Sequence, residues 1–390
     1  MRVAFLTYLN LENTAGKNSS AGAIARISGL SKQVDSFIVH KNNFYYANSD
    51  RLKYPTPLFM SYYLFLPIYF LFDNIISFLF FILGGSNSFP LSEAAHISFS
   101  YRIDLFLKVL YVAKKHKLDI IQVEFPALSV GAFFLTRLLG LKLVVDEHNI
   151  EFHKVLRSKG KSPAASLLKS WELFCLKLAD GVIVPSNLDK TILQKHGLKD
   201  YILVIPNALA SSYEIKNIDK TGCTIIFHGS LNYYPNFEAI SIIDRYIARR
   251  MPEFKFVVVG SGEVSVSSKN VEVVGFVEDI YSFLSRCDIA IVPLLQGGGT
   301  RFKILDYWNA ALPVISTKVG AEGLDYTDGK NILIADTWSN FRKKIRQLAR
   351  NRKLRALLSK NGKSLLESKY LWNKHKSSLH IFYTKLRVVR

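Results

Sequence analysis

The chain has 390 residues, 49% of them hydrophobic, and a formal net charge of +20. This length is enough for two domains with their own cores, and the apolar content excludes a disordered protein. The three cysteines, Cys175, Cys223 and Cys287, are odd in number and widely spaced, which predicts buried thiols rather than a metal site or a disulfide framework. Arg2 is followed at once by a strand-like run, so we expect no signal peptide and a cytoplasmic location.

The first part of the chain, residues 1–207, alternates short apolar runs with helical patterns. This alternation predicts a doubly wound parallel sheet. A turn at 14–22 follows the first strand, and Gly16 in it is a candidate for close backbone contact with a phosphate. The expected strands are 3–7, 36–40, 120–123, 142–146, 181–185 and 202–205, and the expected first helix is 21–32.

Residues 54–92 form an unusually apolar insertion in which Asp73 is the only charged side chain. Pro67 and Asp73 interrupt it, so no clean run of about 20 apolar residues remains for a single membrane span. A single span would also place strands of one sheet on opposite sides of a bilayer. Three interpretations stay open: an interfacial hydrophobic lobe, helices packed in the core or at an interface, and a double span.

The second part, residues 221–370, repeats the alternating plan after a polar linker at 208–220. It predicts a second doubly wound domain, with ligands at the carboxyl ends of the strands and the reaction in the cleft between domains. Residues 337–390 have a helical pattern. The expected strands are 224–227, 255–259, 271–274, 288–292 (or 288–294 by its full apolar run), 314–316 and 332–334.

The loop at 297–303 combines features of an anion site. Three glycines let the backbone approach a ligand, and Thr300 is placed to cap a helix that starts at Arg301. The cations of Arg301 and Lys303 oppose the helix dipole unless an anion is bound there. We therefore predict that both cations and the amides of 299–302 stabilise a diphosphate leaving group. The chain contains no Asp-x-Asp motif, so we expect no metal and no other cofactor.

Positive charge is concentrated near the end of the chain, where residues 341–390 hold sixteen Lys and Arg against one acidic residue, Glu367. The chain lacks the usual nucleic-acid reading motifs, so we expect no nucleic-acid partner. Together with the apolar insertion, the basic segment predicts peripheral attachment to an anionic membrane surface.

The stretch 293–317, PLLQGGGTRFKILDYWNAALPVIST, resembles the nucleotide-sugar-binding segment of the family-4 (group 1) glycosyltransferases. The resemblance implies a GT-B fold of two Rossmann-like domains facing across a cleft, with a C-terminal helix, 371–390, that crosses back to the N-terminal domain. Further matching pieces occur in the family's order: HNIE at 148–151, VIPN at 204–207, FHGS at 227–230 and YLW at 370–372.

The resemblance also implies roles for single residues. His148 matches the position that contacts the transferred sugar, Gly229 and Ser230 match a donor-phosphate loop, and Asp306 matches a carboxylate that binds the donor's ribose. A glutamate usual in the family is replaced by Gly298, so the sequence leaves the donor sugar and base open. The remaining candidates for donor binding are Gly298, Gly299, Thr300 and Phe302.

We therefore predict a transferase, in the hexosyltransferase class, that moves a sugar from a nucleotide diphosphate to a glycan or lipid-linked acceptor in cell-surface polysaccharide or glycoconjugate synthesis. The resemblance implies retention of anomeric configuration. One alternative is a non-catalytic binding or scaffold protein, which the change at Gly298 permits. Another is an NAD-dependent dehydrogenase, disfavoured because the G-x-G at 260–262 lacks the third glycine and the first strand is not followed by the fingerprint.

Overall fold

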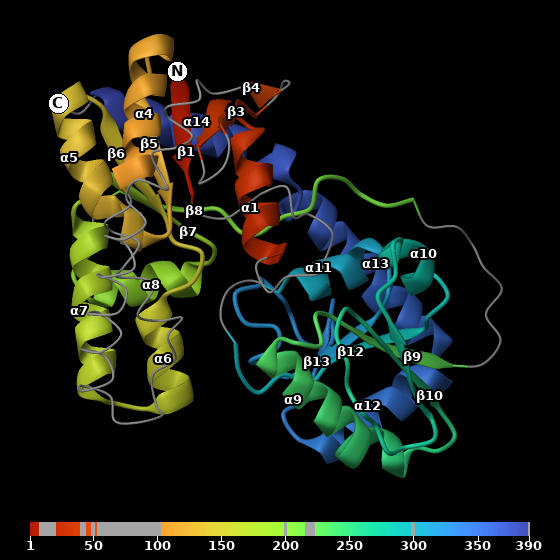
Figure 1. Cartoon of the computed structure of the whole chain (residues 1–390). Coiled ribbons are helices and arrows are strands. Elements are labelled where there is room, and N and C mark those ends of the chain that lie inside the picture. The colour runs from red at the N-terminus through yellow and green to blue at the C-terminus, as the bar shows by residue number, and fades with distance from the viewer. Residues whose placement is uncertain are drawn as a thin grey trace. The chain divides into compact units, whose positions relative to one another are not determined.

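The computed structural model describes residues 1–7, 21–39, 44–47, 51–52, 103–198, 201–214, 223–297 and 301–388. The chain divides into two compact units (Figure 1). The first unit comprises Met1–Glu12, Ala23–Ile205 and His375–Arg390, and the second comprises Asn13–Gly22 and Pro206–Lys374. The apolar insertion at 54–92 lies outside the described residues, so its three interpretations stay open.

In the described part of the first unit, eight strands form one sheet in the order β4-β3-β2-β1-β5-β6-β7-β8. The six strands from β2 to β8 in this order run parallel, and β3 and β4 are added antiparallel at one edge. The parallel strands are almost wholly buried, as expected for a sheet covered on both faces. The strands are β1 (Arg2–Leu6), β2 (Asp35–Val39), β3 (Phe44–Tyr46), β4 (Arg51–Leu52), β5 (Ile120–Glu124), β6 (Lys142–Asp146), β7 (Gly181–Val184) and β8 (Ile202–Val204).

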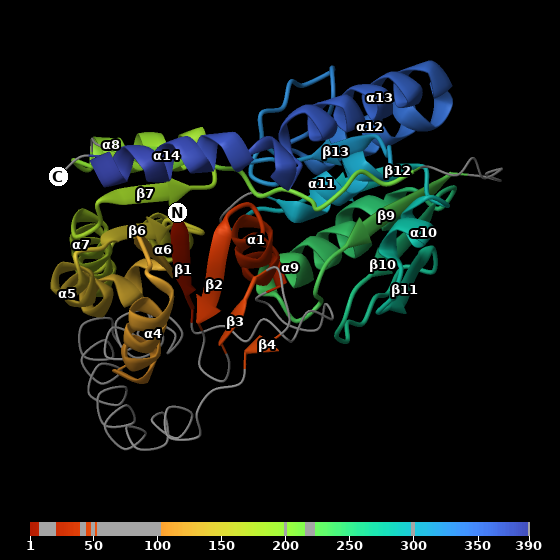
Figure 2. The same ribbon diagram turned by 90° about the horizontal axis from the view of Figure 1, so that it is seen from above.

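Helices cover this sheet, and local capping fixes several of their ends. Ser162 and Ser186 each accept a hydrogen bond from a backbone N–H in the first turn of the helix that follows. Gly181 on β7 leaves room for Phe382 and Leu386 of α14 (Lys376–Val388), which runs along that strand (Figure 2). The other helices are α1 (Ala21–Ser31), α4 (Ile103–His116), η2 (Pro126–Leu128), α5 (Ser129–Leu139), α6 (Glu151–Lys159), α7 (Pro163–Lys177) and α8 (Asn187–Lys195).

The described part of the second unit contains a six-stranded, fully parallel sheet in the order β11-β10-β9-β12-β13-β14. Its strands are β9 (Thr224–His228), β10 (Lys255–Val259), β11 (Val271–Gly275), β12 (Ile289–Val292), β13 (Val314–Ser316) and β14 (Leu333–Ile334). The helical elements are α9 (Tyr234–Ile242), η3 (Ile243–Ile247), η4 (Ala248–Arg250), α10 (Ile280–Leu284), α11 (Phe302–Asn309), α12 (Trp338–Arg350), α13 (Arg352–Lys369) and η5 (Trp372–Lys374).

Two predicted boundaries near the anion loop were wrong. The strand expected at 288–294 covers only Ile289–Val292, because Pro293 has no N–H to continue the ladder. The helix expected to start at Arg301 starts at Phe302. Arg301 is instead the N-cap residue, with an extended backbone and no capping hydrogen bond from its side chain.

Each sheet has a point where the strand order reverses direction. It lies between β1 and β5 in the first unit and between β9 and β12 in the second. Ligands of open α/β sheets bind outside the carboxyl ends of the strands at such points. Within the described residues, no helix has both the length and the apolar character needed to cross a bilayer.

A buried carboxylate, Glu147, follows β6 directly. Its side chain is 1% exposed, and neither carboxylate oxygen has a hydrogen-bond partner among the described residues. Burial, with the nearby charges of Glu172 and Glu151, raises the pKa of Glu147 well above its usual range. Glu172 is better satisfied, because its two oxygens accept the backbone N–H groups of Glu151 and Phe152 at the start of α6.

We predict that Glu147→Gln makes thermal stability less sensitive to pH. A carboxyl with a raised folded-state pKa contributes stability that is present below its unfolded pKa and is lost as pH rises through the folded value. The amide does not titrate, so the melting temperature of the variant minus that of the wild type should increase from pH 5.5 to pH 8.5. The change in unfolding free energy is at most about 1.4 kcal/mol per pH unit for one proton.

Differential scanning calorimetry at four pH values measures this difference. Glu263→Gln serves as the matched control, since Glu263 is exposed. A difference between Glu147→Gln and wild type that is constant or decreasing with pH would contradict the raised pKa.

Candidate functional site

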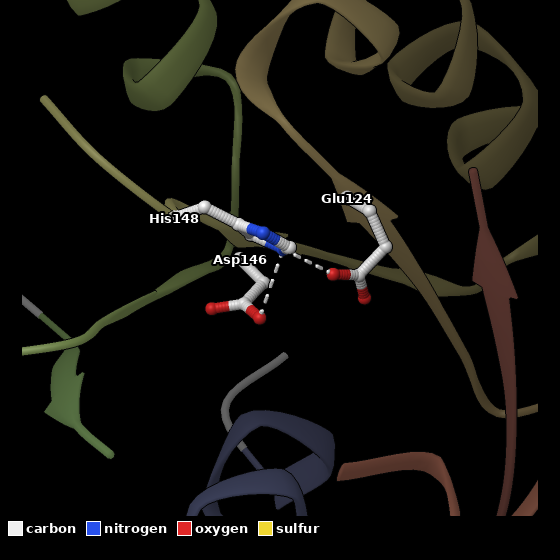
Figure 3. A group of neighbouring side chains, drawn as sticks. All are labelled: Glu124, Asp146 and His148. Atoms are coloured by element: carbon white, nitrogen blue, oxygen red, sulfur yellow. Dashed lines mark hydrogen bonds and ion pairs between the residues drawn. The ribbon is translucent and has the colours of Figure 1, made fainter. Parts of the chain in front are cut away.

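Three polar side chains of the first unit converge at the carboxyl ends of β5 and β6 (Figure 3). Glu124 and Asp146 are register partners on these parallel strands, so their side chains share one face of the sheet. His148 follows two residues after β6. Its Nε2 lies 2.7 Å from Glu124 Oε2 and 3.5 Å from Asp146 Oδ2. The predicted sugar-contacting residue, His148, is therefore 5% exposed and tied to two carboxylates.

Asp146 is neutralised by Arg26, a buried side chain of α1. Arg26 donates from Nε to Asp146 Oδ2 at 2.8 Å and from Nη2 to Oδ1 at 2.6 Å. Its Nη1 donates to the carbonyl of Ile205 at 2.8 Å. Such a bidentate arginine–carboxylate pair is a strong and directional interaction. The pair fixes the side chain of Asp146, whose Oδ2 lies 3.5 Å from Nε2 of His148.

Among the described residues, Glu124, Asp146 and His148 lie close enough together to hold one metal ion. One potential ligand atom of each residue lies within 4.8 Å of those of the other two. Both oxygens of Asp146, however, already accept hydrogen bonds from Arg26. The positive charge that a metal would supply is thus present as a guanidinium. The group fits an internal ion network better than a metal centre.

Burial and the charge of Asp146 raise the pKa of Glu124 to about 7, although hydrogen bonds from His148 and Gln122 act in the opposite direction. Phe125, the next residue, has φ = 80° and ψ = 141°, a combination that costs a non-glycine residue about 1–3 kcal/mol. Its N–H donates to the carbonyl of Asp146, and its ring lies 4.3 Å from that of His148. Strain of this kind is typical of functional sites, and here it places an aromatic face against the histidine.

The second unit holds the predicted cations at the start of α11. Lys303 Nζ donates to Asn236 Oδ1 at 2.7 Å and lies 4.0 Å from the centre of the Phe227 ring. Burial and the neighbouring Arg301 lower the pKa of Lys303 well below its usual range. Arg301 is 7% exposed, and its Nη2 donates to the carbonyl of Val319 at 3.3 Å. Arg301 is therefore buried and Lys303 half-buried, so neither is a fully solvated surface charge.

Asp306 lies one helical turn after Lys303 on α11, and its carboxylate contacts Tyr281 and His228. Its Oδ1 accepts from the Tyr281 hydroxyl at 2.8 Å, and its Oδ2 lies 3.5 Å from His228 Nε2. Burial raises the pKa of Asp306 to about 6, against the opposing effects of Tyr281 and Lys303. Burial and Lys303 lower the pKa of His228 to about 3, so this ring stays neutral. The ring also packs edge-on against Tyr307.

Gly229 sits beside the lysine, at the carboxyl end of β9. Its φ is 150°, and an added Cβ would lie 2.7 Å from Asn236 Nδ2 and 3.1 Å from Lys303 Nζ. Only glycine leaves this space. Ser230 follows, and its carbonyl accepts from Asn236 Nδ2 at 2.8 Å. The site of the second unit thus combines the predicted Gly229, Ser230, Lys303 and Asp306.

Other predicted residues are placed differently or lie outside the described residues. The ring of Phe302 is partly buried against the core of the second unit, and the prediction for this residue concerns its backbone amide. Gly16, Gly298, Gly299 and Thr300 are not among the described residues.

Sequence reasoning missed Arg26, Gln122, Glu124 and Asp146. One signal was available, because Gln122 and Glu124 alternate on one face of the otherwise apolar strand IIQVE. A second was Arg26 within the apolar helix AGAIARISGLS. Neither signal identifies the partner, since Arg26 and Asp146 are 120 positions apart.

Two protein-family models match the chain. Residues 88–212 match the model described as Glycosyltransferase Family 4, and residues 222–351 match the model described as Glycosyl transferases group 1. An uncharacterised glycosyltransferase of Methanocaldococcus jannaschii is 27% identical over 147 residues, which cover 34% of this chain and 41% of that protein. One of Haemophilus influenzae is 24% identical over 217 residues, which cover 52% of this chain and 58% of that protein. The chain thus spans about half the length of these relatives.

Solved structures resemble the whole chain in fold. Sucrose-phosphate synthase of Thermosynechococcus elongatus aligns over 100% of both chains with a TM-score of 0.71 and 14% identity. HepE of Anabaena, solved in complex with UDP-glucose, aligns over 98% of this chain and 99% of its own, with a TM-score of 0.62 and 15% identity. These matches confirm the predicted GT-B architecture. The motif resemblance is confirmed as well: the chain belongs to the family-4, group 1 glycosyltransferases and has their GT-B fold.

Proposed function

We propose that the protein transfers a sugar from a nucleotide-diphosphate sugar to a glycan or lipid-linked acceptor, with retention of configuration and without a metal ion. The observation that carries this proposal is the pair of basic side chains, buried Arg301 and half-buried Lys303, at the start of α11. Family membership supports the reaction class.

The cation site suits a diphosphate. Burial and the repulsion from Arg301 disfavour the charged form of Lys303, and a bound anion reverses that balance. Gly229 lets the backbone of β9 approach within contact of Lys303, so a phosphate held there also meets main-chain atoms. The charge that develops on the departing diphosphate is then stabilised by groups already in place.

Asp306 is proposed to accept hydrogen bonds from the hydroxyls of the donor's ribose. Tyr281 holds one of its oxygens at 2.8 Å and so fixes the carboxyl orientation. HepE is described in complex with UDP-glucose, which makes a uridine diphosphate sugar the first donor to test here.

Two features support metal independence. The sequence has no Asp-x-Asp motif, and Arg301 and Lys303 would supply to a bound diphosphate the positive charge that a divalent ion provides elsewhere. In the first unit, Arg26 supplies the positive charge beside Asp146. His148 is proposed to contact the transferred sugar.

We predict that Lys303→Ala and Arg301→Ala each lower kcat about 10²–10³-fold, because each removes one preorganised stabiliser of the leaving group. Transfer is measured by mass spectrometry with a panel of UDP-, GDP-, ADP- and CMP-sugars, in excess EDTA. The matched control is Lys318→Ala, whose side chain is 74% exposed.

A loss of less than about tenfold in both variants, at unchanged melting temperature, would remove the donor-phosphate role from this site. Loss of activity in EDTA that Mn²⁺ restores would contradict metal independence. Donor binding without transfer or donor hydrolysis would favour the non-catalytic alternative.

We also propose that the protein attaches to an anionic membrane surface and works in cell-surface polysaccharide or glycoconjugate synthesis. The basic segment 341–390 supplies an electrostatic attraction of about 1 kcal/mol for each cation near the surface. In the first unit, α5 exposes Phe134 (68%) and Leu138 (77%) on one helical face. Exposed apolar groups of this size are candidates for insertion into a membrane interface.

The prediction is that the protein sediments with anionic liposomes at low salt and is partly released in high salt, since salt screens only the electrostatic part. Phe134→Ser with Leu138→Ser should weaken the salt-resistant part. Phe276→Ser is the matched control, as Phe276 is 46% exposed in the second unit. Equal recovery in the supernatant with and without anionic liposomes at low salt would refute attachment.

A further inference from the structure

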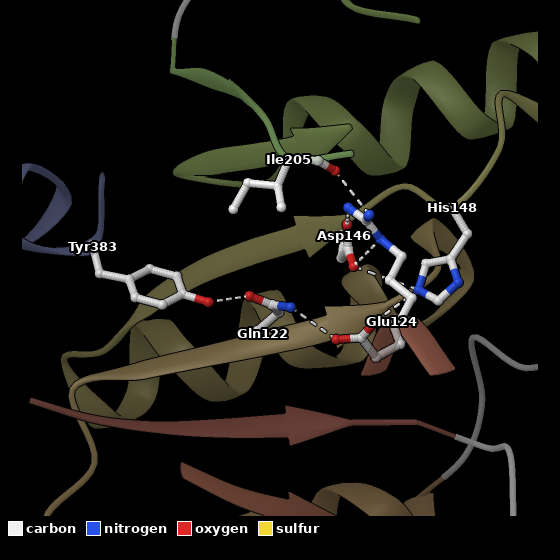
Figure 4. A network of polar contacts seen from close by, with 7 residues as sticks. Gln122, Glu124, Asp146, His148, Ile205 and Tyr383 are labelled. Carbon is white, nitrogen blue, oxygen red and sulfur yellow. Dashed lines mark hydrogen bonds and ion pairs between the residues drawn. The ribbon is translucent and has the colours of Figure 1, made fainter. Parts of the chain in front are cut away.

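A chain of buried hydrogen bonds leads from α14 to His148 (Figure 4). The hydroxyl of Tyr383, on α14, bonds to Oε1 of Gln122 on β5. Nε2 of Gln122 donates to Glu124 Oε1 at 2.8 Å, and Glu124 Oε2 lies 2.7 Å from His148 Nε2. Tyr383, Gln122 and Glu124 are each 0% exposed, so water does not compete for these bonds.

The direction of donation along this chain follows from its carboxylate. An ionised Glu124 only accepts, so the NH₂ group of Gln122 must face it. The amide oxygen of Gln122 then faces Tyr383, whose hydroxyl donates. Burial raises the pKa of Tyr383 well above its usual range, so the hydroxyl keeps its proton.

The same argument fixes the histidine. Nε2 of His148 faces Glu124, and it also lies 3.5 Å from Asp146, both of whose oxygens accept from Arg26. In the singly protonated ring, Nε2 lies between two acceptors and therefore carries the proton. Nδ1 is then the unprotonated nitrogen, and no hydrogen bond of the described residues involves it.

We propose that Tyr383, Gln122 and Glu124 are positioning residues that hold His148 in the Nε2–H tautomer, so that Nδ1 accepts a hydrogen bond from a hydroxyl of the transferred sugar. The sugar contact rests on the proposed function, whereas the tautomer does not. The proposal gives the C-terminal helix a role in the site of the first unit, because α14 supplies the first donor of the relay.

The sharpest test is Glu124→Gln. Gln122 still donates to the oxygen of the amide introduced at position 124. The NH₂ group of that introduced amide then faces Nε2 of His148. That nitrogen must then accept, and the proton moves to Nδ1. We expect the substitution to reverse the tautomer of His148, with a fall in kcat of about 10²-fold and little change in KM for the donor.

The tautomer is read by two-bond ¹H–¹⁵N correlation of the histidine side chains at pH 8.5, above the pKa of Glu124, with the His148 signals assigned from a His148→Gln spectrum. Tyr383→Phe, which removes only the first donor, should reduce the Nε2–H preference and lower kcat about 3- to 10-fold. The matched control is Tyr370→Phe, which removes another buried hydroxyl, one that accepts from Asp325 in the second unit.

Either variant decides the proposal if the other fails to fold. The proposal is overturned if Glu124→Gln keeps the Nε2–H form, or if Tyr383→Phe leaves the tautomer ratio as Tyr370→Phe does. A tautomer that reverses as expected in a protein whose wild type transfers no sugar supports the relay and refutes the proposed function. Sugar transfer by the wild type, together with a tautomer that Glu124→Gln leaves unchanged, supports the proposed function and refutes the relay.

Discussion

The buried ion pair between Arg26 and Asp146 sets the geometry on which the first site depends. The desolvation of each buried charge costs several kcal/mol. This cost is offset only when the ion pair is bidentate and further hydrogen bonds satisfy the remaining polar atoms. Arg26 meets this requirement with three donors directed at Asp146 and the carbonyl of Ile205. One side chain thus ties α1 to β6 and to the end of β8. Loss of one partner leaves an unpaired buried charge, at a cost of about 3–5 kcal/mol.

The carboxylates near this pair differ in how they are satisfied. Asp146 has a cation, Glu124 has the amide of Gln122 and the ring of His148, and Glu172 has two backbone N–H groups. Glu147 has no partner among the described residues, and its pKa is raised well above the usual range by burial. The strained backbone of Phe125 is held in the same place by its bond to Asp146. The carboxyl of Glu147, unpaired among the described residues, and the strained backbone of Phe125 both lower the stability of the folded state. Such costs are common where a site must be preorganised.

The sequence predicts the sheets well and the polar network poorly, for a physical reason. A parallel strand buried on both faces must be a nearly continuous apolar run, so β6 and β10 are found at their observed bounds. Arg301 takes an extended backbone that no local pattern specifies, and the helix therefore begins one residue late. Tyr383 and Gln122 are 261 positions apart, and only the folded sheet and α14 bring them together. The donor-loop candidates at 298–300 lie outside the described residues, so their roles remain predictions.

The two sites differ in how their charged groups are satisfied. In the first unit, Arg26 pairs with Asp146, and Glu124 lies at hydrogen-bond distance from both Gln122 and His148. In the second, Arg301 and Lys303 share the start of α11 with one carboxylate, Asp306, which is oriented by Tyr281. The neutral His228 adds no charge. An anionic ligand beside Arg301 would favour the charged form of Lys303, whereas the polar groups of the first site already have partners within the protein.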